Sequence, residues 1–155
     1  MNLDLVARAH ALGLKVMIDQ VISHTAYVHP WFVESRASKN NPKADWYVWA
    51  DGKTRNGKAV PPNNWRSELQ LPKAWQWSPE REQWYLATFL SFQPDLNWRN
   101  PELREEMFDT VRTWLGRGVD GFRLDIFGSI MHDPALRDND RKPTLVAGIP
   151  RVQTP

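Results

Sequence analysis

The chain has 155 residues, of which 41% are hydrophobic and 25% are charged, as in an ordinary globular protein with one core. The formal net charge is only +2, and basic and acidic residues are interleaved, so we expect no nucleic-acid partner. The sequence holds no apolar run of membrane-spanning length, no signal-peptide core in MNLDLVARAH, and no cysteine. These absences predict a cytoplasmic protein without a membrane partner, disulfides or thiolate zinc sites.

The N-terminal part of the sequence predicts a helix followed by a strand. Apolar residues recur at roughly helical spacing over residues 3–12, and Gly13 is placed to end the helix. The run LKVMIDQVIS, residues 14–23, is rich in β-branched residues and is typical of a strand that is buried on both faces of a parallel sheet. The polar residues His24 and Thr25 come directly after it.

Residues 30–94 show no regular period. Pro, Asn, Lys and Trp dominate there, and the strand-like pieces WYVW and QWYLATF are separated by turn residues such as Asn56-Gly57. The stretch is too long for a connecting loop and too short for a full domain, so it predicts an inserted subdomain. Most of the nine tryptophans lie in this part of the chain, and we expect most of them to pack in a small core rather than to stack on sugar rings.

A second helix and strand follow. Asn100 is a plausible N-cap, Pro101 fits the first helical position, and an apolar stripe through Leu103 and Met107 continues to Trp114. The strand VDGFRLDIF, residues 119–127, comes next, and residues 129–155 are weakly patterned and rich in proline. Helix, strand, insertion, helix and strand in this order predict a parallel sheet, whose ligands lie at the C-terminal ends of its strands.

The second strand places charge on one face and apolar side chains on the other. Arg123 and Asp125 are two residues apart and therefore point to the same side. Phe122 and Leu124 point to the opposite side, which we expect to pack against helices. Asp125 and His24 both lie at strand ends, where a functional site is expected.

Three segments, in this order, resemble signature segments of the α-amylase superfamily of glycoside hydrolases: VMIDQVISH, QPDLNW and GVDGFRLDIF. The likeness is strongest to the α-glucosidase and oligo-1,6-glucosidase branch. The inserted domain of that branch is also resembled by two further segments, HPWFVESRASKNNPKADWYVWAD and PPNNW. The resemblance implies an α/β fold, a fragment of a (β/α)8 TIM barrel with its third and fourth strands and flanking helices. Barrel parts would occupy residues 1–29 and 96–128, an inserted B-like subdomain residues 30–95, and a loop-rich tail residues 129–155. A whole barrel needs about 250 residues, so we expect a truncated domain.

The resemblance implies retaining hydrolysis of α-glucosidic bonds in short α-glucosides, with a small oligosaccharide or α-glucoside as substrate and no cofactor. Asp125 matches the nucleophile of the family, and Arg123 matches the arginine beside it. The pairing is physically sensible, because a neighbouring guanidinium favours the ionised carboxylate that a nucleophile requires.

Four further residues match substrate-binding positions. His24 matches a histidine that hydrogen-bonds the sugar, Asp19 matches an aspartate that braces the strand end, and Gln93 and Phe89 match positions that line the same subsite. Ser23 stands where calcium-dependent amylases carry an asparagine ligand, so we expect no metal there.

Alternatives to hydrolysis remain open. A transglucosylase or trehalose synthase-like enzyme would use the same nucleophile, and a non-catalytic carbohydrate-binding relative would usually lack it. Ile126 is β-branched, like the residue associated with α-1,6 cleavage. The sequence contains no match to the general acid or to the later His-Asp pair of the family, so we expect the chain alone to be inactive and poorly stable.

The remaining titratable residues receive structural interpretations. Asp120 is expected to be structural, and Asp95 to order a turn. His10, His29 and His132 show no ligand spacing and are treated as ordinary.

Overall fold

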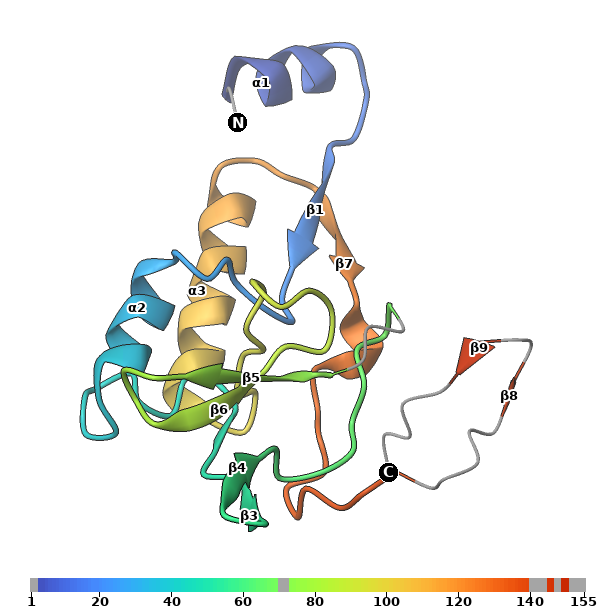
Figure 1. Ribbon diagram of the computed structural model, residues 1–155. Coiled ribbons are helices and arrows are strands. Elements are labelled where there is room, and N and C mark those ends of the chain that lie inside the picture. The colour runs from blue at the N-terminus through green and yellow to red at the C-terminus, as the bar shows by residue number, and fades with distance from the viewer. Residues whose placement is uncertain (1–2, 70–72, 140–144, 147–148, 151–155) are drawn as a thin grey trace.

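The computed structural model describes residues 3–69, 73–139, 145–146 and 149–150 (Figure 1). The elements are, in chain order, α1 (Leu3–Ala11), β1 (Met17–Val21), α2 (Pro30–Ala37), β2 (Trp49–Ala50), β3 (Lys53–Arg55), β4 (Lys58–Val60), β5 (Trp75–Ser78), β6 (Gln83–Leu86), α3 (Pro101–Gly116), β7 (Gly121–Asp125), the 3₁₀ turn η1 (Phe127–Ser129), β8 (Leu145–Val146) and β9 (Ile149–Pro150).

The two predicted strands form a parallel pair. β1 lies beside β7, with Asp19 opposite Arg123 and Val21 opposite Asp125 (Figure 1). The predicted N-terminal helix is confirmed as α1, and the strand expected at residues 14–23 is shorter, covering only β1. The order of helices and strands therefore predicted the parallel α/β arrangement correctly.

The expected burial of this sheet is wrong. The side chains of β1 alternate between exposed and half-buried, and Met17 is 65% exposed. On β7, Leu124 was expected to pack against helices but is 43% exposed. Burial on both faces requires helices over the sheet and strands on both edges. Within the described ranges, this sheet consists of β1 and β7 alone.

Residues 30–99 hold small elements that the sequence only partly predicted. β2, β6 and β5 form an antiparallel three-stranded sheet in that order, and β3 pairs with β4 in a hairpin around Asn56-Gly57. Helix α2 and strand β5 were not predicted. In α2 only Phe32 and Ser35 are buried, so the sequence carries no apolar stripe, and the His29 ring accepts a hydrogen bond from the N–H of Trp31 as the cap.

Aromatic side chains build the core of this region. One cluster surrounds Phe32 and Tyr47, and a second joins Trp75 to Leu86. Four of the nine tryptophans are buried, and three more are partly buried and pack against these clusters: Trp46, Trp65, Trp75 and Trp98, and then Trp31, Trp49 and Trp84. The Trp98 indole donates to the carbonyl of Ile22 at 2.7 Å and thereby fastens the start of α3 to the end of β1. The interpretation of most tryptophans as packing residues is therefore supported.

Helix α3 begins and ends where the sequence predicted. The Asn100 side chain accepts from the N–H of Leu103 at 3.0 Å, with Pro101 in the first turn. At the other end, Gly118 has a φ of +90° and donates to the carbonyl of Leu115, while Val119 donates to that of Trp114, as in a Schellman motif. This tight exit leads the chain directly into β7.

Arg81 holds the inserted elements together. Its guanidinium is buried and donates to the carbonyl oxygens of Ser35, Ser38 and Ala44, and it lies over the ring of Trp49. Burial lowers the pKa of this guanidinium, and the nearby carboxylates oppose that shift. One side chain thus links the end of α2 to the β5–β6 hairpin.

Replacing Arg81 with methionine is expected to destabilise the protein by about 3 kcal/mol, because three carbonyl groups each lose a charged donor and keep only a neutral one from Ser35 or Asn41. Urea unfolding followed by tryptophan fluorescence measures the change. The matched control is Arg104→Met, since Arg104 lies exposed on α3 and should be replaced at little cost. Equal effects of the two substitutions would contradict the role of Arg81.

Candidate active site

The pairing of β1 with β7 brings three charged side chains onto one surface. Because Asp19 lies opposite Arg123 in the ladder, and Asp125 lies two residues further on, the three side chains point to the same side. Arg123 hydrogen-bonds to Asp19, and its second terminal nitrogen, Nη2, lies 2.7 Å from Oδ1 of Asp125. One guanidinium therefore bridges two carboxylates on neighbouring strands.

The charges of this cluster reinforce one another. The hydrogen bond to Asp19, followed by the charge of Asp125, raises the pKa of Arg123. The side chain of Asp125 is only 30% exposed, whereas those of Asp19 and Arg123 are more than half exposed. Asp125 is thus the most sheltered member, and a fixed cation lies next to it.

His24 lies near this cluster. Its ring stacks on Phe89 with centroids 5.9 Å apart and planes at 8°, and its Nδ1 lies 2.9 Å from Oγ of Ser23. Burial lowers the pKa of His24, and the negative charge of Asp125 partly opposes that shift. Val21 lies opposite Asp125 in the ladder and His24 follows three residues later, so the ends of β1 and β7 bring His24 and Asp125 to the same edge of the sheet.

The position of Gln93 relative to His24 follows from a backbone hydrogen bond. It lies in the turn before Pro94, whose carbonyl accepts from the N–H of Thr25, so it is close in the fold to the segment that carries His24. Its Oε1 is buried and has no hydrogen-bond partner among the described residues. The structure therefore brings Asp19, Arg123 and Asp125 into contact, stacks His24 on Phe89, and places Gln93 in the turn beside the segment that carries His24.

The chain turns sharply after Asp125. Ile126 adopts a left-handed conformation, with φ 51° and ψ 34°, which is uncommon for a β-branched residue. The turn η1 follows, and the Ser129 hydroxyl donates to Glu68 of the inserted region. This turn sends the chain away from the sheet and across the inserted elements.

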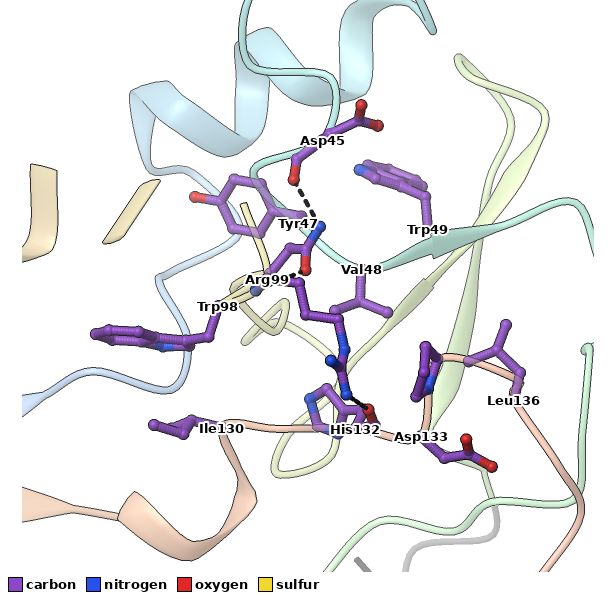
Figure 2. A pocket seen from close by; sticks show the side chains of 12 residues that line it. Asp45, Tyr47, Val48, Trp49, Trp98, Arg99, Ile130, His132, Asp133 and Leu136 are labelled. Atoms are coloured by element: carbon purple, nitrogen blue, oxygen red, sulfur yellow. Dashed lines mark hydrogen bonds between the residues drawn. The ribbon is translucent and has the colours of Figure 1, made fainter. Parts of the chain in front are cut away.

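The segment after η1 packs against the inserted region and encloses a pocket of about 240 Å³ (Figure 2). Figure 2 shows the Arg99 side chain crossing the pocket to the backbone carbonyl of His132, 2.9 Å from Nη2. On the other side, the Trp65 indole donates to the carbonyl of Arg137 at 2.8 Å, and Asn64 exchanges hydrogen bonds with Asn139. The loop-rich tail is thus fastened to the insertion over residues 132–139.

Several structural roles emerge for residues that the sequence left as ordinary. Asp120 accepts from the N–H of Val16 and from Lys15 and His10, which agrees with its structural interpretation, and these donors lower its pKa. The sequence gave no sign that His132 is buried beside Asp95, because the two residues belong to distant segments without a shared motif. Asp95 does order a turn through the N–H of Thr88, as expected.

Among the residues with described positions, no group of three or more His, Asp and Glu side chains is arranged to hold a metal ion. Ser23 is buried and faces the ring of His24.

Among the helices that the structure describes, none combines the length and the apolar character that crossing a membrane requires.

The sequence of residues 2–153 matches the family model of the alpha-amylase catalytic domain. The chain belongs to the α-amylase family. It is 57% identical over 142 residues to a probable α-glucosidase of Rhizobium meliloti, covering 92% of this chain and 24% of the relative. It is 45% identical over 131 residues to an oligo-1,6-glucosidase of Parageobacillus thermoglucosidasius, covering 84% of this chain and 22% of the relative.

Solved structures of the family superpose closely on the chain. The α-glucosyl transfer enzyme XgtA has a TM-score of 0.85 at 57% identity, covering 91% of this chain and 26% of that enzyme. The trehalulose synthase MutB has a TM-score of 0.83 at 41% identity, covering 90% of this chain and 24% of that enzyme. The chain therefore spans about a quarter of the length of the relatives that it matches.

Substituting Asp125 with asparagine is expected to lower the pKa of His24 further, because the negative charge that opposes the effect of burial is removed. A proton NMR titration of the His24 ring measures this shift. The control is Asp109→Asn on α3, whose carboxylate pairs with Arg112 and should leave the titration unchanged. An unchanged or raised His24 pKa in the Asp125 variant would contradict the proximity of the two groups.

Proposed function

We propose that this chain contributes the nucleophile and part of the sugar-binding wall to a retaining α-glucosidase. The observation that best supports this proposal is the position of the Asp125 carboxylate. It is sheltered from solvent and lies 2.7 Å from the Arg123 guanidinium, at the C-terminal end of a parallel strand. A carboxylate next to a fixed cation at the end of a parallel strand is placed to act as a nucleophile. In this proposal β1 and β7 are the third and fourth strands of a (β/α)8 barrel.

The reaction would proceed in two displacements. An oxygen of Asp125 attacks the anomeric carbon, the glycosidic bond breaks, and the leaving oxygen takes a proton from a second carboxylic acid. Water then attacks the same carbon, returns a proton to the second carboxylate, and releases Asp125 as a free carboxylate. Asp19 is unsuited to supply the proton, because its carboxyl oxygen is engaged by the hydrogen bond from the Arg123 guanidinium. The proton donor is therefore a different residue from Asp19.

The sugar-binding wall would consist of His24, Phe89 and Gln93. The stacked rings of His24 and Phe89 offer an apolar edge with a ring nitrogen, and Gln93 adds a side-chain amide beside the segment that carries His24. We infer that residues 30–95 act as a B-like subdomain, residues 129–155 as the loop beyond the nucleophile, and that the protein works in the cytoplasm on small α-glucosides. The proposal includes no cofactor.

The nucleophile is tested in a chimera in which this chain replaces the matching 142-residue segment of the Rhizobium meliloti relative. The chimera is expected to hydrolyse p-nitrophenyl α-glucoside, and Asp125→Asn should lower kcat by on the order of 10⁴-fold. A fluorinated glucosyl reagent should label Asp125, as seen by peptide mass spectrometry.

The matched control for this substitution is Asp109→Asn, which leaves the site intact and should retain activity. Labelling of another side chain, or full turnover by the Asp125 variant, would overturn the proposal. The 155-residue chain alone, without a proton donor, should show no measurable hydrolysis.

Transfer of glucose to a second sugar is the other candidate function. It is favoured by the likeness to XgtA, which is described as an α-glucosyl transfer enzyme, and to MutB, a trehalulose synthase. The covalent intermediate on Asp125 is the same in both functions, and the outcome depends on whether water or a sugar attacks it. A binding-only role is disfavoured, because Asp125 and Arg123 are both present and paired.

Product analysis separates hydrolysis from transfer. With maltose, isomaltose and sucrose as substrates, a hydrolase releases glucose in proportion to bonds cleaved, at every substrate concentration. We expect this proportion in the chimera. Accumulation of longer or isomeric sugars that increases with substrate concentration would favour the transferase instead, and quantitative chromatography of the products measures the ratio.

A further inference from the structure

A buried carboxyl–imidazole pair lies outside the Asp19, Arg123 and Asp125 cluster. Asp95 is 1% exposed, and its Oδ1 accepts from the N–H of Thr88 at 3.1 Å. Its Oδ2 makes no hydrogen bond within the described ranges and faces Nε2 of His132 at 3.4 Å. The His132 side chain is only 11% exposed. Such a pair inside the protein requires an explanation, because burying polar groups is costly unless they serve one another.

Asp95 lies where the segments of the proposed sugar-binding wall meet. Its backbone forms a β-bridge with His24, and the next residue, Leu96, donates to the carbonyl of Ser23 at 2.9 Å. Its side chain holds the N–H of Thr88, the residue before Phe89. Movement of Asp95 would therefore displace both rings of the His24–Phe89 stack.

His132 lies on the segment that follows the proposed nucleophile. Figure 2 shows it on the floor of the pocket, with the Arg99 side chain reaching its backbone carbonyl. Its ring also packs near the Trp65 ring, with centroids 6.1 Å apart. The contact of His132 with Asp95 thus joins the segment after Asp125 to the wall that carries His24.

We propose that His132 and Asp95 form a buried couple that shares one proton and acts as a positioning device. It sets the spacing between the segment after the nucleophile and the His24–Phe89 wall. This inference rests on the proposed function for its catalytic consequence, while the sharing of the proton can be tested without any activity.

The local charges agree with a shared proton. Burial raises the pKa of Asp95 to about 7, and the nearby Glu68 adds to that rise. Burial, followed by the charge of Arg99, lowers the pKa of His132 to about 4. The adjacent Asp133 is neutralised by Arg137, 2.6 Å from its Oδ2. Between about pH 4 and 7 the folded couple therefore holds one proton.

The unfolded chain also holds one proton on these two residues between the ordinary pKa values of Asp and His, so the couple adds almost no pH dependence to stability in that window. Each residue alone behaves differently. The raised pKa of Asp95 alone makes stability fall as pH rises from about 4 to 7. The lowered pKa of His132 alone makes stability fall as pH drops from about 6.5 to 4.

The two single variants should therefore show opposite slopes. The first variant, His132→Gln, is tested in the 155-residue chain and compared with the unmodified chain. As the pH rises toward 7, its unfolding equilibrium constant is expected to increase by up to about tenfold per pH unit. Asp95→Asn should raise it by a similar factor per unit toward pH 4. The double variant should be flat again, and urea unfolding at several pH values measures all four proteins.

Parallel pH profiles of both single variants and the unmodified chain, or slopes of the same sign, would overturn the proposal. If a variant does not fold, ¹⁵N NMR of the unmodified chain decides instead. The His132 ring should protonate only near pH 4 and report a second, smaller step near pH 7 from Asp95. A single protonation step at the ordinary histidine pKa would overturn the proposal.

The positioning role is tested in the chimera. His132→Ala is expected to lower kcat/KM for p-nitrophenyl α-glucoside by about tenfold, mainly through KM. Asp95→Asn is expected to remove an inflection near pH 7 from the pH profile, because the pKa of about 7 belongs to Asp95. His132→Gln, which keeps an N–H donor, should restore kcat/KM to within about threefold.

An unchanged pH profile in Asp95→Asn, or an unchanged kcat/KM in His132→Ala, would reduce the couple to a structural contact and overturn the positioning role. The control Asp109→Asn should keep both parameters. An inactive unmodified chimera would instead count against the proposed function, and the opposite slopes of the 155-residue chain would still decide the shared proton.

Discussion

The parallel register of β1 and β7 is the constraint on which the proposed site depends. It sets Asp19 opposite Arg123, so that one guanidinium reaches a carboxylate across the ladder and another two residues along its own strand. A shift of one residue in this register would turn the side chains of one strand to the other face and separate the charges. The electrostatic environment of Asp125 is therefore a consequence of strand pairing.

The inserted region supplies the rigid wall opposite that cluster. Its strands are short, and its order comes from aromatic packing and from Arg81, which satisfies carbonyl groups of α2 and the following loop. A small region with little regular structure needs such contacts, because its backbone polar groups cannot all pair in helices and sheets. Hydrogen bonds from Ser67 to the carbonyl of Phe89, and from the N–H of Thr88 to Asp95, hold the segment that carries the Phe89 ring on which His24 stacks.

Two kinds of polar contact hold the segment after η1 against the rest of the described structure. Near the surface, hydrogen bonds from Asn64, Trp65 and Arg99 fasten the segment after η1, and each is worth about 1 kcal/mol. In the interior, Asp95 and His132 meet with almost no access to water. The buried contact is the one that responds to pH, because burial shifts both pKa values in directions that keep a proton between the two residues.

The sequence by itself determined the local elements and the family likeness. The cap at Asn100, the glycine exit at Gly118 and the alternation of β7 follow from the nearest neighbours along the chain. Helix α2, the partners of Arg81 and the meeting of Asp95 with His132 were decided only by the tertiary structure. They depend on contacts between distant segments, which leave no periodic pattern in the residues that make them. The exposure of β1 and β7 was likewise decided by which elements lie around them, a property that no run of apolar residues encodes.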